Sequence, residues 1–142
     1  MSRIPYINAV GTLMYAMVST RLYISHGVGV VSRYMENSGK ENWATVKWVL
    51  QYLTGTCDYC ITYNGGCELV CGYVDSDFAG DLDKMRSTYG YVFTLAGGPI
   101  SWMSKLQNIV SLSTTKVENM VASHACKKEI WLKGLVGEFG RM

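Results

Sequence analysis

The hydrophobic period of this 142-residue chain changes twice, and these changes limit what it can fold into. Up to about residue 55, apolar side chains recur at the three- and four-residue spacing of helices. From Asp58 they alternate with the two-residue period of strands, and after residue 115 the helical spacing returns. We therefore predict an α/β chain with a helical segment over residues 1–57, followed over residues 58–142 by antiparallel strands and a long helix.

Within the first segment, apolar positions predict three helices. Residues 10–18 and 24–35 each place their apolar side chains at helical spacing, and the polar residues 37–39 interrupt this pattern. A third helix is expected to begin near Lys40 and to end at Gly55.

The second segment is expected to contain two hairpins. Residues 59–63 and 69–73 alternate on either side of Asn64-Gly65-Gly66, which is typical of a hairpin that turns at the glycines. Residues 89–95 and 100–104 form another alternating pair around a glycine-rich turn.

Four carboxylates fall within nine residues where the first hairpin gives way to a polar loop. They are Asp75, Asp77, Asp81 and Asp83. Like charges this close repel one another, so the cluster is unfavourable unless a cation, most simply a divalent metal, lies among them. For Asp81 and Asp83 a solvated loop is the simpler explanation, because they flank an ordinary polar turn.

The predicted C-terminal helix places Glu118 on the same wheel face as Val121, the stripe expected to be buried against the sheet. Carboxylates from two separate elements can hold a divalent metal that activates water and stabilises a phosphoryl transition state. We therefore expect Asp75 and Glu118 to lie within about 5 to 8 Å of each other. A second explanation stays open, in which Thr115 and Glu118 form a capping box that only satisfies backbone donors.

Other metal sites are less well supported by the spacing. The cysteines that could form a zinc site are Cys57, Cys60, Cys67 and Cys71. Only six residues separate the two pairs, whereas zinc ribbons usually leave roughly twelve or more. The Asp75-x-Asp77 pair does not continue as an EF-hand loop, because Arg86 stands where the closing Glu belongs.

Composition favours a soluble chain inside the cell, in the cytoplasm or nucleus. Five cysteines, an odd number, are typical of free thiols in a reducing compartment. No apolar run reaches the ~18 residues of a membrane span, so no membrane partner is expected. The apolar run 7–18 could pass for a short signal sequence, but Asn8 and Gly11 interrupt it. A net charge of +2 neither requires nor excludes a polyanionic partner.

Several runs resemble the ribonuclease H domain of copia-type LTR retrotransposon polyproteins. They are Gly72-Tyr73-Val74-Asp75-Ser76-Asp77-Phe78-Ala79-Gly80-Asp81, Arg86-Ser87-Thr88-Tyr89-Gly90-Tyr91-Val92-Phe93 and Ile100-Ser101-Trp102-Met103-Ser104-Lys105-Leu106-Gln107. Residues 9–15, 20–21 and 48–56 resemble the segment that joins reverse transcriptase to ribonuclease H in the same polyproteins. The resemblance therefore covers nearly the whole chain.

The resemblance implies a ribonuclease H fold that cuts the RNA strand of RNA/DNA hybrids with two Mg²⁺ ions. Asp75 matches the first catalytic carboxylate and Glu118 the second, with Asp77 and Asp81 as further candidate metal ligands. The implied partners are an RNA/DNA hybrid and the rest of the Pol polyprotein.

The chain departs from the family pattern in two ways that bear on activity. Where the family reads Ser-Thr-Glu-Ala-Glu-Tyr, residues 114–119 keep Glu118 but place Lys116 at the preceding acid. The family also continues beyond the long helix into a strand with a third carboxylate. We therefore expect an incomplete fold, weak or absent Mg²⁺ binding and no nuclease activity from this chain alone. The alternative function is a non-catalytic relic whose exposed sheet edge favours self-association or another protein interaction.

Overall fold

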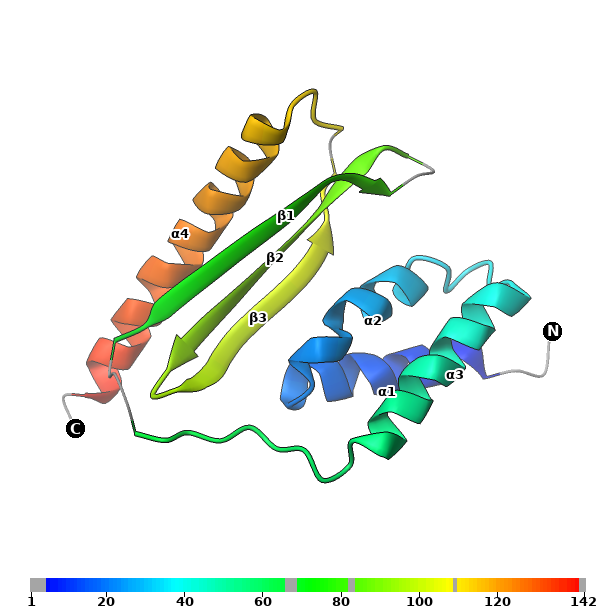
Figure 1. The fold of residues 1–142 in the computed structure, drawn as a ribbon, viewed down its shortest axis with the longest axis horizontal. Helices are drawn as coiled ribbons and strands as arrows, with labels where there is room; N and C mark the ends of the chain where they lie inside the picture. The colour runs from blue at the N-terminus through cyan, green and yellow to red at the C-terminus, as the bar shows by residue number, and fades with distance from the viewer. Residues whose placement is uncertain (1–4, 66–68, 82–83, 109, 141–142) are drawn as a thin grey trace. The chain divides into compact units, whose positions relative to one another are not determined.

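The computed structural model describes residues 5–65, 69–81, 84–108 and 110–140. The chain forms two compact units, Met1–Cys60 and Ile61–Met142 (Figure 1). The sequence placed this boundary between residues 57 and 58. That the units correspond to a reverse-transcriptase connection and a ribonuclease H domain stays a prediction.

The first unit is helical and has one core. Its elements are α1 (Tyr6–Ser19), the 3-10 helix η1 (Leu22–Ile24), α2 (Ser25–Ser32) and α3 (Lys40–Gly55). Its fully buried side chains are Tyr6, Val10, Leu13, Ile24, Val28, Val31 and Val46. The Tyr6 hydroxyl donates to the Val31 carbonyl oxygen at 2.7 Å, which ties α1 to α2 inside this core.

The second unit is a three-stranded antiparallel sheet followed by a long helix. The strands β1 (Cys71–Asp81), β2 (Arg86–Leu95) and β3 (Gly98–Leu106) lie in the order β1-β2-β3. Helix α4 (Thr114–Phe139) runs alongside the sheet (Figure 1). The predicted α/β class, with helices first, then antiparallel strands and a long helix, is confirmed.

One stripe of α4 packs against β2 and forms the core of this unit. Val117 and Val121 contact Tyr89, and further along the helix Ala125 and Leu132 contact Phe93. These helical positions recur at intervals of one or two turns and so share a face.

Within the described residues, no helix combines the length and apolar character that a bilayer crossing needs.

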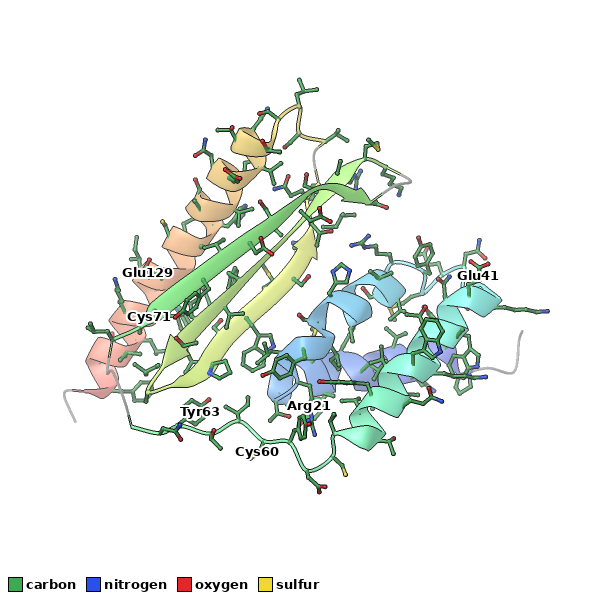
Figure 2. All side chains as sticks on the ribbon, in the orientation of Figure 1. Arg21, Glu41, Cys60, Tyr63, Cys71 and Glu129 are labelled. Atoms are coloured by element: carbon green, nitrogen blue, oxygen red, sulfur yellow. The ribbon has the colours of Figure 1, made fainter. Side chains whose placement is uncertain are left out.

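The predicted hairpin between residues 59–63 and 69–73 is wrong. Described residues 59–65 form no strand, and the Asn64 N–H donates instead to the Ala96 carbonyl oxygen at 3.0 Å. Tyr63 lies beside the β2–β3 turn (Figure 2), where its hydroxyl donates to the Pro99 carbonyl oxygen at 2.9 Å. Its ring occupies the space that a side chain on Gly98 would need. Tyr63 and Asn64 therefore contact the β2–β3 turn and do not form a strand of a hairpin.

Strand β1 also continues past the position where the sequence suggested that it ends. It runs through Asp75 as far as Asp81, and its register with β2 shifts between Asp77 and Asp81. In this bulge Ala79 adopts a positive φ of 53°, and its N–H donates to the Oγ of the buried Ser87 at 3.1 Å. Asp75, Asp77 and Asp81 are consequently spread along a strand and its irregular end.

Candidate functional site

A groove of about 240 Å³ lies between β1 and the first half of α4. It is lined by Val74, Asp75, Ser76, Glu118, Val121 and Ala122. The structure therefore brings the two carboxylates selected from the sequence to one groove. Their separation of about 5 to 8 Å stays a prediction.

Asp75 reaches this groove from the edge of the sheet. It pairs with Gly90, whereas its neighbour Ser76 pairs with Tyr89, whose ring packs against Val117 of α4. Because side chains alternate between faces, the Cβ of Asp75 starts on the face turned away from α4. Three consecutive β1 residues line the groove, so it follows the strand edge rather than one face. Asp75 is exposed, and its Oδ1 accepts the Ser76 N–H at 2.9 Å.

The start of α4 determines whether Glu118 is used for capping. The N-cap is Ser113, whose Oγ accepts the Lys116 N–H at 3.3 Å. A capping box built on Thr115 and Glu118 is therefore wrong, because Thr115 is already inside the helix. Glu118 is left without a capping role.

The expectation that Glu118 lies on the buried stripe of α4 is also wrong. Val117 and Val121 are buried to 1% and 2% exposure, whereas Glu118 and Ala122 are exposed. An exposed carboxylate at the flank of an apolar stripe keeps its hydration and can still reach a ligand in the groove.

Asp77 and Asp81 do not line the groove. Asp77 is exposed, and its carboxylate folds over Gly80, where an added Cβ would clash with it. Asp81 is opposite Arg86 in the backbone pairing of β1 with β2. Asp83 lies outside the described residues.

Two carboxylates on one groove make a sparse metal site. Among the residues that the structure describes, no three His, Cys, Asp or Glu side chains gather in a metal-binding group. Asp75 and Glu118 offer carboxylate oxygens, the ligands that Mg²⁺ prefers, and Mg²⁺ keeps several waters in such sites. The donor set thus fits a weakly held, largely hydrated ion.

The zinc alternative has no cluster to support it among the described residues. Cys57, Cys60 and Cys71 are exposed free thiols, as is Cys126 on α4. Cys67, the remaining member of the proposed set, lies outside the described residues.

A second groove of about 230 Å³ contains a residue that the sequence did not single out. It is lined by Tyr89, Lys105, Leu106, Gln107, Asn108, Met120 and His124. Gln107 is only 4% exposed, and within the described part of the chain its Nε2 has no hydrogen-bond partner. The ring of His124 stacks on Tyr89 with centroids 5.7 Å apart, and burial raises the pKa of the Tyr89 hydroxyl. Gln107 ends one of the runs that carry the family resemblance, but nothing in the sequence marks it as buried, because its burial depends on the packing of the folded chain.

Comparison with known proteins places the chain among transposon polyproteins. It is 53% identical over 140 residues to the retrovirus-related Pol polyprotein from transposon TNT 1-94 of Nicotiana tabacum, covering 99% of this chain and 10% of that protein. It is 38% identical over 136 residues to the corresponding polyprotein from transposon RE2 of Arabidopsis thaliana, covering 95% of this chain and 9% of that protein. No family model and no solved structure matches the chain.

A third relative is a much shorter protein. The secreted RxLR effector protein 161 of Plasmopara viticola is 42% identical over 133 residues, which cover 93% of this chain and 94% of that protein. The chain belongs to the family of copia-type retrotransposon Pol polyproteins, as its sequence motifs predicted. It spans about a tenth of the length of the two polyproteins.

Proposed function

We propose that the second unit carries part of a ribonuclease H site, which acts on the RNA strand of an RNA/DNA hybrid. The observation that carries this proposal is that Asp75 and Glu118 line one groove. Asp75 comes from the first of three antiparallel strands, and Glu118 from the helix that follows them. The polyprotein family of the chain supports the same assignment.

In this proposal Asp75 and Glu118 hold Mg²⁺ and orient it toward the hybrid. Ser76 fixes one oxygen of Asp75 through its N–H, which directs the other carboxylate oxygen to a ligand. When bound, the ion activates a water and neutralises charge on the scissile phosphate. Because two carboxylates hold Mg²⁺ weakly, we expect the 142-residue chain alone to leave a hybrid essentially uncut. A complete site would take a further ligand from other Pol segments.

Metal binding tests the site independently of cleavage. Titration with Mn²⁺, followed by electron paramagnetic resonance, should detect weak binding that is reduced at least about tenfold in Asp75→Asn and in Glu118→Gln, because each removes a charged ligand. Glu138→Gln is the matched control, since Glu138 is exposed on the same helix and does not line the groove. Binding that is the same in all three variants would rule out this site.

Cleavage of a labelled RNA/DNA hybrid in Mg²⁺ tests the expected inactivity. The chain should give no product above background over the reaction time. Product formation that disappears in Asp75→Asn would support the nuclease assignment and contradict the claim that the chain is inactive alone.

A non-catalytic interaction module is the second candidate function. The observation that favours it is the effector protein, since the chain covers 94% of a relative whose name describes no nuclease. In this alternative the chain acts through its surface. The side of β1 that no described strand pairs with is the surface that can recruit another strand. Analytical ultracentrifugation over a range of concentrations should then detect dimers, and a monomer at every concentration would reject self-association.

An intracellular location stays a proposal for either function.

A further inference from the structure

The second groove holds a buried amide whose hydrogen-bonding capacity is only half used. The Gln107 Oε1 accepts a long hydrogen bond of 3.5 Å from the Ser111 hydroxyl, and Nε2 has no partner among the residues that the structure describes. Whichever amide atom faces Ser111, the other is left unpaired. Because nearly all buried polar groups in folded proteins are paired, a ligand or an ordered water is expected beside Gln107.

The groove presents hydrogen-bond donors from two elements. Lys105 and Asn108 flank Gln107 near the end of β3, and His124 faces them from α4. None of the described residues that line the groove is acidic. A cation, two amides and an imidazole favour a negatively charged ligand with several acceptor oxygens.

The backbone of Gln107 holds its position firmly. Its N–H donates to the Ser87 carbonyl oxygen at 2.8 Å, and Ser87 itself is 1% exposed. Tyr89, at 7% exposure, forms one wall of the groove, and Met120 and Leu106 add apolar surface. The groove of about 230 Å³ is several times the ~30 Å³ that a water occupies in the liquid, so it has room for more than one water.

We propose that this groove binds the phosphate group of a nucleotide, with Lys105 and Gln107 as the main donors. Phosphate offers more acceptor oxygens than a carboxylate, so it can accept hydrogen bonds from donors on both β3 and α4. Lys is also an established phosphate ligand. The apolar walls then contact the sugar or base. The phosphate can belong to a free nucleotide or to a nucleic-acid backbone, and neither requires metal at Asp75 and Glu118.

The side-chain amide resonance of Gln107 in ¹⁵N-labelled full-length chain reports directly on this groove. At constant pH and ionic strength, inorganic phosphate and adenosine monophosphate should shift this resonance saturably, whereas acetate should not. Lys105→Met should weaken binding at least about tenfold through the loss of a charged hydrogen bond, equivalent to roughly 1.4 kcal/mol. Lys127→Met is the matched control, because Lys127 is exposed on α4 and does not line the groove.

A short RNA/DNA hybrid distinguishes the two sources of phosphate. Competition between the hybrid and adenosine monophosphate supports a backbone phosphate, and binding of adenosine monophosphate alone supports a free nucleotide. An unmoved Gln107 resonance, an equal shift with acetate, or unchanged affinity in Lys105→Met would overturn the proposal and leave only water in the groove. Asp75→Asn should retain phosphate binding, which separates this result from failure of the metal site.

Discussion

Lys116 is the residue at which this chain most clearly loses a local stabilising contact. It occupies the third position of α4 after the Ser113 N-cap, where an acidic side chain would complete a capping box. Its positive charge also lies at the positive end of the helix dipole. Lys116→Glu should therefore raise the free energy of unfolding by roughly 0.5 to 1 kcal/mol, measured by denaturant titration.

Lys127→Glu is the control for this change, because it makes the same charge substitution in the middle of α4. Lys127→Glu should change the free energy of unfolding much less than Lys116→Glu does. Equal stabilisation by both would indicate a general charge effect and contradict the capping explanation.

The site residues show what residue-level reasoning could and could not predict. Asp75 and Glu118 could be selected from the sequence, because a carboxylate among apolar repeats stands out. The exposure of Glu118 could not be predicted from the sequence, because it depends on Ser113 being the N-cap and on the angle at which α4 packs on the sheet. Gln107 belongs to a run that resembles the family, but only the folded chain reveals that its side chain is buried.

Strand β1 and helix α4 of the second unit differ in how they tolerate added volume. A Cβ at Gly72 in β1 would approach the Phe93 ring at 2.6 Å, whereas a Cβ at Gly134 in α4 would meet no atom within 4 Å. Gly72→Ala should destabilise the fold by about 1 to 3 kcal/mol through overpacking, because Phe93 is 1% exposed and cannot move freely. Gly134→Ala should stabilise it by about 0.8 to 1 kcal/mol through helix propensity.

These two substitutions control for each other, since each adds one methyl group to a glycine. Thermal or denaturant unfolding of both variants gives the comparison. A stabilising Gly72→Ala would mean that the close approach of β1 to Phe93 is wrong.

Helices and strands whose apolar side chains keep one period over a long stretch could be predicted well from the sequence. The helix expected between Lys40 and Gly55 has those bounds, and the sequence also located β2, β3 and α4. The alternating segment at residues 59–63 was wrongly predicted to be a strand, because its two-residue period is that of a strand, whereas in the structure Tyr63 packs on the β2–β3 turn. Strand β1 was predicted too short, since a bulge interrupts the pattern without ending the pairing.

Across the whole molecule, buried tyrosines in both units should make stability fall at alkaline pH. Burial raises the pKa of Tyr6 in the first unit and of Tyr89 in the second above the usual 10.0. Above about pH 10 the unfolded chain therefore releases these protons while the folded chain retains them. This contribution is fully present below pH 10 and is lost as the pH rises through the folded-state values.

Denaturant titrations at several pH values above and below 10 would measure this loss. Tyr89→Phe should reduce the pH dependence of the second unit and leave that of the first unchanged. An identical pH dependence in the variant would show that Tyr89 does not contribute.

If an ion binds beside Asp75 and another strand pairs with β1, the edge of β1 would couple these two binding events. Within the described residues β1 pairs only with β2, and the groove with Asp75 and Glu118 follows its other side. A strand that paired there would border the groove. The affinity for an ion in the groove and the affinity for the added strand would therefore depend on each other. By thermodynamic reciprocity, the factor by which the strand tightens ion binding equals the factor by which the ion tightens strand binding. A measurement of strand affinity with and without Mg²⁺ would therefore report on the metal site without any cleavage.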